Sequence, residues 1–118
     1  MRTSVMMDSA TMKALQSAFQ SDSAYGPRGG SRWINEAIVG MVAADPALEL
    51  VGLGEDLMSR PKFDRLKSFG LSQEGAAALG LALRRVRGQD VTQEGVRSAV
   101  IRAAIRWRLA KRDEDSSH

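Results

Sequence analysis

The sequence predicts a mainly α fold in which four helices pack against one two-stranded antiparallel ribbon. Four segments carry apolar residues at the spacing of an amphipathic helix. Residues 2–7 alternate in polarity with the two-residue period of a strand, and residues 66–71 resemble a second short strand. The order of strand, helix, break and helix then occurs twice along the 118 residues, which indicates an internal repeat.

The chain opens with the first strand and an amphipathic helix. Residues 2–7 are too few and too β-branched to begin a helix. Asp8 or Ser9 can cap the helix that follows, which is expected to end near Asp22. The apolar stripe of this helix consists of Met12, Leu15, Ala18 and Phe19.

A glycine-rich loop leads into the second helix. Residues 23–31 contain three glycines and a proline, which predicts a loop. Ser31 is a favourable N-cap for a helix over residues 32–44, and Asp45-Pro46 ends it. One face of this helix carries Ile34, Ala37, Ile38, Met41 and Val42, and a second apolar side carries Trp33 and Val39.

The second half of the chain repeats this order after a connector over residues 45–64. Ser72 can cap a third helix, Gly88-Gln89-Asp90 is a tight break, and Thr92 can cap a last helix that runs to about Lys111. The stripe of the third helix is Ala76, Leu79, Ala82, Leu83 and Val86. The last helix has one stripe of Val96, Ala99, Val100, Ala103 and Trp107 and another of Ile101, Ile105 and Leu109. A helix that is apolar on two sides is expected to be buried on two sides.

An offset of 64 residues aligns the two strands and the helices that follow them, and an offset of 62 aligns the later helices. The identities at the first offset are Ser4/Ser68, Ala14/Ala78, Leu15/Leu79 and Ala18/Ala82. A short strand needs a partner for its backbone groups, and each half supplies one. We therefore expect the strands to pair as a ribbon packed on the helices. The alternative is a chance similarity of two helical hairpins.

The composition excludes several kinds of chemistry. The chain has no cysteine and its one histidine is His118, which argues against disulfides, thiol catalysis, a histidine triad and a histidine or cysteine metal site. Gly26–Gly30 lacks the lysine and hydroxyl residue of a P-loop, and no acidic pair has a spacing typical of acid/base catalysis. We therefore expect that the protein is not an enzyme and binds no cofactor. No apolar run approaches the roughly 18 residues of a membrane span, and no signal peptide is evident, so we expect a cytoplasmic protein.

The charge is distributed unevenly along the chain. Residues 1–59 hold four Lys/Arg against seven Asp/Glu, and residues 60–118 hold thirteen against seven. A basic half suggests a polyanionic partner, and the alternative is a solvated arginine-rich helix face. Seven arginines of the last two helices can serve either purpose: Arg84, Arg85, Arg87, Arg97, Arg102, Arg106 and Arg108.

The repeat unit resembles the ribbon-helix-helix family of DNA-binding proteins, the Arc- and MetJ-type repressors. RTSVMMDSATMKAL resembles the family's alternating strand, polar cap and first helix, and GGSRWINEAIVGMV resembles its glycine turn and the Ser-Arg-x-x-x-Glu opening of its second helix. LKSFGLSQEGAAAL and GQDVTQEGVRSAVI are a looser second copy. Family members are normally homodimers, so the resemblance implies one pseudo-dimeric domain, a tandem ribbon-helix-helix with units at residues 1–44 and 65–112. Tandem units of this kind occur in a plasmid DNA-transfer accessory protein.

The resemblance implies that the ribbon enters the major groove of double-stranded DNA and that its outward side chains reach base edges. Val5, Met7, Phe69 and Leu71 form the expected inward set. The residues expected to read bases are Arg2, Ser4, Met6, Lys67 and Ser68. Lys67 falls on the inward phase of its strand, so Lys67 or Arg65 reaches DNA only if the strand end splays. The alternative for all these positions is a ribbon face that is merely solvated.

The family also binds phosphate at the N-terminus of the second helix of each unit. These positions are Ser31 and Arg32 in the first unit and Thr92 and Gln93 in the second. Simple N-capping is the alternative and is compatible with phosphate binding. Both Trp33 and Trp107 lie in apolar helical patterns, so core packing is favoured over base stacking.

The resemblance thus implies a bacterial, sequence-specific DNA-binding protein that is monomeric in solution. It implies either a role at a plasmid transfer origin, with a relaxase or another transfer or partition protein as partner, or transcriptional repression that includes antitoxin-like autoregulation. The two halves differ, so an imperfect palindrome or an asymmetric site is expected. A helical protein–protein adaptor without nucleic-acid binding is the second hypothesis, favoured by the acidic first half and by the acidic tip at residues 113–115.

Overall fold

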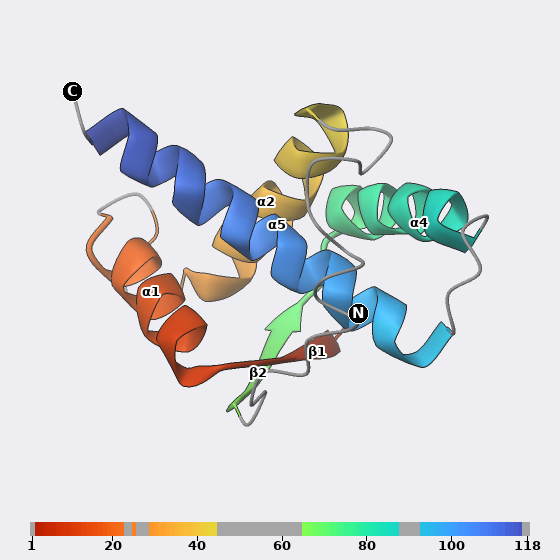
Figure 1. The fold of residues 1–118 in the computed structure, drawn as a ribbon, viewed down its shortest axis with the longest axis horizontal. Coiled ribbons are helices and arrows are strands. Elements are labelled where there is room, and N and C mark those ends of the chain that lie inside the picture. The colour runs from red at the N-terminus through yellow and green to blue at the C-terminus, as the bar shows by residue number, and fades with distance from the viewer. Residues whose placement is uncertain (1, 23–24, 26–28, 45–64, 88–92, 117–118) are drawn as a thin grey trace.

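The computed structural model describes residues 2–22, 25, 29–44, 65–87 and 93–116, and in these ranges the fold is mainly α with one two-stranded ribbon (Figure 1). The elements in chain order are β1 (Arg2–Met7), α1 (Ser9–Gln20), α2 (Gly30–Ala44), β2 (Arg65–Gly70), α4 (Gln73–Arg87) and α5 (Gln93–Ser116). The predicted fold class is therefore confirmed at this level. The predicted connector at residues 45–64 and the break at residues 88–90 lie outside the described residues.

The two strands pair with each other in antiparallel orientation. The pairs are Arg2↔Gly70, Thr3↔Phe69, Ser4↔Ser68, Val5↔Lys67, Met6↔Leu66 and Met7↔Arg65. Ser4 and Ser68, which are identical at the offset of 64 residues, lie opposite each other. Adding 64 to each β1 position and subtracting 64 from each β2 position converts Arg2↔Gly70 into Met6↔Leu66 and Thr3↔Phe69 into Val5↔Lys67, so five of the six pairs are symmetric about the serine pair.

The helices cover one face of this ribbon, which lies at one edge of the molecule (Figure 1). Successive strand residues point to opposite faces, and the predicted inward residues Val5, Met7, Phe69 and Leu71 are all buried. The second strand begins and ends one residue earlier than predicted, so Leu71 follows it and still reaches the core.

The core lies where α5 crosses α2, with α1 and α4 packed around this pair (Figure 1). Both predicted apolar sides of α5 are buried, because Val100 and Ala103 on one stripe and Ile101 and Ile105 on the other are at most 1% exposed. Trp33 is buried in the same core, and Trp107 packs on it. A side chain at Gly40 would place its Cβ 3.0 Å from the Trp107 ring, so glycine permits this close crossing.

Three local expectations differ from the structure. The helix α2 begins at Gly30, so Ser31 lies within its first turn rather than ahead of it, and the Trp33 amide donates to the Gly29 carbonyl. Asp8 occupies the N-cap position of α1 but makes no side-chain cap hydrogen bond. Val39 is 37% exposed, because the second apolar side of α2 is covered at Trp33 only. The cap at Ser72 is confirmed, since its Oγ accepts a hydrogen bond from the Gly75 amide at 3.0 Å.

The helix α5 also runs to Ser116, five residues beyond the predicted end at Lys111. No helix within the described ranges is long and apolar enough to cross a membrane. The same ranges hold no cluster of acidic or histidine side chains suited to a metal ion.

Candidate nucleic-acid interface

The face of the ribbon that points away from the helices is the best candidate for an interface. Arg2, Ser4 and Ser68 are exposed on it, and Leu66 is 62% exposed. Met6, opposite Leu66, is partly buried. Within the described part of the chain, no ion pair or side-chain hydrogen bond engages Arg2. Four of the five residues predicted to read bases therefore share one accessible face.

The fifth residue, Lys67, lies on the other face. Its Nζ atom is 5.4 Å from the centroid of the Phe19 ring and 3.2 Å from the position of a Cβ on Gly30. An ammonium over an aromatic face is attracted by the ring quadrupole, which holds this half-buried side chain against α1 and α2. We therefore do not count Lys67 among the base-reading residues.

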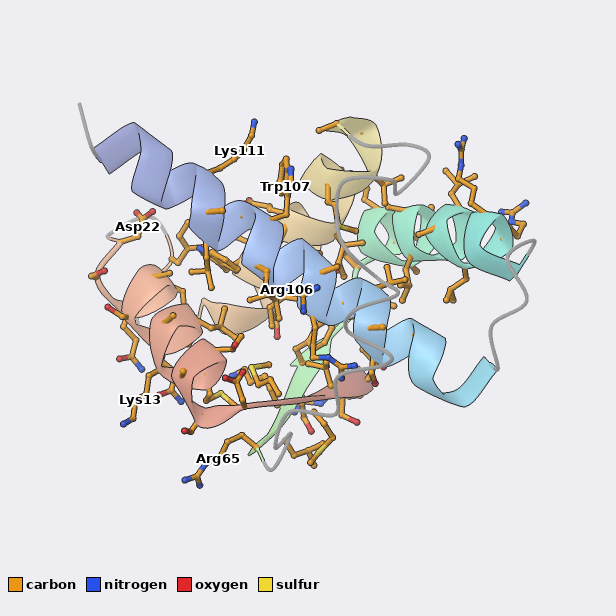
Figure 2. The ribbon with its side chains drawn as sticks, viewed as in Figure 1. Lys13, Asp22, Arg65, Arg106, Trp107 and Lys111 are labelled. Atoms are coloured by element: carbon orange, nitrogen blue, oxygen red, sulfur yellow. The ribbon has the colours of Figure 1, made fainter. Side chains whose placement is uncertain are left out.

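Two cations flank one end of the ribbon: Lys13, which was not predicted from the sequence at the interface, and Arg65, which was considered only for a splayed strand end. Lys13 of α1 and Arg65 of β2 are exposed and line a shallow groove with Ser9, Met12, Gln16 and Leu66. Figure 2 shows both side chains pointing outward at the same corner of the molecule. The sequence signal for Lys13 was weak, since it is a single lysine on the polar side of an amphipathic helix. Two cations beside a groove-sized ribbon favour phosphate contacts.

Ser31 joins α2 to the end of β2. Its Oγ accepts a hydrogen bond from the Gly70 amide at 3.0 Å. Gly70 pairs with Arg2 across the ribbon, so this bond fixes the strand end that carries the exposed arginine. The predicted phosphate ligand is thus also a structural tie between helix and ribbon.

Asn35 completes this tie and was missed from the sequence. Its Nδ2 atom donates to the Ser31 carbonyl at 2.7 Å and to the Gly70 carbonyl at 2.8 Å. Its Oδ1 atom accepts from the amide and the hydroxyl of Ser72 at 2.9 and 3.0 Å. A buried amide with its hydrogen bonds satisfied holds the segment between β2 and α4 in place. A Cβ at Gly75 would lie 2.0 Å from the Oδ1 atom, so the close approach of α4 requires glycine there.

Arg102 plays a comparable role for the other strand. It is 6% exposed, and its Nη1 atom donates to the Met6 carbonyl at 3.0 Å. Met6 and Gly70 are related by the 64-residue offset. Each of the central helices therefore holds the end of one strand through the carbonyl at an equivalent position. The sequence placed Arg102 among the arginines of a solvated or phosphate-binding face, and its burial corrects that interpretation.

Arg32 is the other phosphate ligand predicted in the first unit, and a carboxylate already holds it. Its Nε atom lies 3.1 Å from Glu36 Oε1, and its side chain remains 63% exposed. Glu36 also accepts a hydrogen bond from the Tyr25 hydroxyl and lies 3.3 Å from Arg108 Nη2. Burial raises the pKa of Glu36, but hydrogen bonds from Tyr25 and Arg32 and the charge of Arg108 outweigh it and lower the pKa below its ordinary value.

Arg108 in turn ties α5 to the start of α2. Its Nη1 atom donates to the Trp33 carbonyl at 2.8 Å, and its guanidinium lies 4.5 Å from the centroid of the Trp33 ring. The first turns of α2 are thus held by Tyr25 through Glu36 and by Arg108 through the Trp33 carbonyl. Arg32 in the same turns remains exposed. Thr92, predicted to bind phosphate in the second unit, lies outside the described residues, and so does the side chain of Gln93.

In comparisons with known proteins, no family model, no curated protein and no solved structure matched the chain.

Proposed function

We propose that this chain is a sequence-specific double-stranded DNA-binding protein that inserts the outer face of its ribbon into the major groove. The observation that carries the proposal is the two-sided ribbon: one face is closed by helices, and the other presents Arg2, Ser4 and Ser68 to solvent. A major groove about 12 Å wide admits a two-stranded ribbon whose strands lie about 4.8 Å apart.

We infer further that the chain is a tandem ribbon-helix-helix, equivalent to a dimer of that family in one polypeptide. The symmetry of five of the six strand pairs about Ser4 and Ser68 supports this inference. So do the hydrogen bonds that Gly70 and Met6, which are related by the 64-residue offset, accept at their carbonyls from Asn35 of α2 and Arg102 of α5. Unrelated hairpins have no reason to share a symmetric register. The protein should accordingly behave as a monomer of 12.8 kDa in solution.

The side chains of the outer face match the chemistry of base edges. The guanidinium of Arg2 can donate two parallel hydrogen bonds to a guanine, which is worth about 1–3 kcal/mol of discrimination. The hydroxyls of Ser4 and Ser68 can donate or accept at the centre of the site. Lys13, Arg65 and Arg32 would contact phosphates beside the groove and fix the register of the protein on the duplex.

The test begins with selection of a preferred duplex from a random library, followed by titration of that duplex and a scrambled one. Arg2→Ala should weaken binding to the preferred duplex more than binding to the scrambled one. The matched control is Arg85→Ala, which removes an exposed arginine from α4, away from the ribbon. Binding of both duplexes should also fall steeply between about 50 and 200 mM salt.

Two outcomes would contradict the proposal. One is the absence of duplex binding at low salt, which would leave the helical adaptor as the better interpretation. The other is an equal effect of Arg2→Ala and Arg85→Ala on binding to the preferred duplex. For the cellular role we propose a plasmid transfer-origin accessory protein in the bacterial cytoplasm, with transcriptional repression as the second candidate. Footprinting on the source replicon would separate these roles, because the first places the site at a nick region and the second at a promoter.

A further inference from the structure

We propose that the outer face of the ribbon is chemically polarised, so that one end reads a guanine and the other end reads thymine methyl groups. This inference rests on the proposed DNA binding and assigns a base-contacting role to Leu66. The two ends are the pairs Arg2↔Gly70 and Met6↔Leu66, with the serine pair between them.

The polarity follows from the register. At the 64-residue offset Arg2 corresponds to Leu66, and Met6 corresponds to Gly70. The position that carries the guanidinium of Arg2 at one end of the ribbon therefore carries the branched apolar side chain of Leu66 at the other end. Leu66 is the most exposed of the large hydrophobic side chains within the described ranges, at 62%. It lies on the face opposite the helices, so no core residue covers it.

The chemistry of the major groove identifies what an apolar pair can read there. The C5-methyl group of thymine is the bulkiest apolar group in that groove, whereas the nitrogen and oxygen atoms of the base edges are hydrogen-bond donors or acceptors. Leu66 and the partly buried Met6 have no hydrogen-bond donor on their side chains. Contact with a thymine methyl group would bury apolar surface on both partners, whereas contact with a donor or acceptor would leave that group unpaired.

The cations beside the ribbon reinforce this assignment. Lys13 and Arg65 share a groove with Leu66, so they flank the apolar end. The position that corresponds to Lys13 in the second unit is Ala77, which leaves the arginine end without an equivalent lysine. At the apolar end, Lys13 and Arg65 would therefore contact phosphates and keep the ribbon in the groove. The side chains of Leu66 and Met6 would then need to contact only methyl groups.

The spacing of the two base types also follows from the ribbon. Arg2 and Met6 are four residues apart, which is about 13 Å at the rise of a strand. That length corresponds to about four base pairs at 3.4 Å per step. The preferred site should therefore have a guanine near one end and thymines about four base pairs away.

The test uses modified bases in the selected duplex, with the full chain throughout. Replacing the thymines at one end by uracil removes methyl groups and leaves base pairing intact. For the unmodified protein, the dissociation constant should rise about fourfold for each contacted methyl group that is removed. Leu66→Ala should reduce this sensitivity, because only Met6 then remains to contact a methyl group, and Arg2→Ala should retain it in full. Replacing the guanine by 7-deazaguanine, which lacks the N7 acceptor, should weaken the unmodified protein and Leu66→Ala but leave Arg2→Ala unchanged.

The outcomes separate this inference from the proposed function. Specific duplex binding that is indifferent to uracil would overturn the inference and leave the proposed function standing. A selected site with two identical half-sites would do the same. Absence of any duplex binding would overturn the proposed function itself. Because Leu66 is exposed, Leu66→Ala should fold normally, and an unchanged far-ultraviolet circular dichroism spectrum and melting temperature verify this.

Discussion

Replacement of Asn35 by alanine should destabilise the fold and loosen the arginine end of the ribbon. The side chain makes four hydrogen bonds, to the Ser31 and Gly70 carbonyls and to the amide and hydroxyl of Ser72. Each hydrogen bond contributes about 1 kcal/mol net, and buried groups left unpaired cost more. We expect the free energy of unfolding to fall by about 2–4 kcal/mol. The Gly70 end of β2 should also become less protected from hydrogen exchange.

Urea denaturation followed by circular dichroism measures the first effect, and amide exchange measures the second. The matched control is Gln20→Ala, which truncates an exposed amide side chain at the end of α1 and should change the free energy by less than about 0.5 kcal/mol. If Asn35→Ala costs no more than this control, the network does not stabilise the fold and the reasoning is wrong. If stability falls but Gly70 exchanges as before, the network does not hold the strand end.

Three further substitutions test other contacts. A glycine-to-alanine substitution within a helix ordinarily stabilises it by about 1 kcal/mol. In Gly75→Ala, however, the new Cβ would lie 2.0 Å from Asn35 Oδ1, so the melting temperature should fall. A higher melting temperature would contradict the close approach of α4 to Asn35. Glu36→Gln should destabilise the protein by less than about 1 kcal/mol at neutral pH, because the carboxylate is partly exposed. A carboxylate whose pKa is lowered by folding contributes stability at a pH above its ordinary pKa, and this contribution disappears as the pH falls through its pKa in the folded state. The difference in urea midpoint should therefore vanish once the pH lies below the folded pKa, and a difference that stays constant with pH would refute the assignment. Arg102→Leu leaves the Met6 carbonyl without its charged donor and should cost about 1.5–3 kcal/mol in urea unfolding; an unchanged midpoint would show that this bond contributes nothing.

The strands, their inward residues and the helical stripes were predictable from the sequence because each depends on a local period. Val5 and Phe69 are buried as their alternation indicated. The antiparallel pairing of the two strands was also predicted, but the register that places Ser4 opposite Ser68 was not. The strand pairing was predictable because each half of the sequence carries one short strand that needs a partner, a long-range inference that no local period provides.

The ties that hold the site were not predictable, because they join residues far apart in the chain. Asn35 lies 35 residues from Gly70, and Arg102 lies 96 residues from Met6. Nothing in a helical period distinguishes an arginine that donates to a distant carbonyl from one that faces solvent. Similarly, Lys67 lies on the inward phase by sequence, but only the position of the Phe19 ring explains why a charge is stable there.

Because β1 and β2 belong to one chain, the stability of this ribbon does not depend on the protein concentration. In a homodimer the two strands meet only by association, so stability depends on protomer concentration and the ribbon dissociates when the protein is scarce. Here both strands belong to the same polypeptide, and the effective concentration of one tethered segment relative to another is typically about millimolar. The ribbon should therefore form at the few copies per cell at which a weak dimer would have come apart. Its thermal midpoint should be the same at nanomolar and micromolar protein.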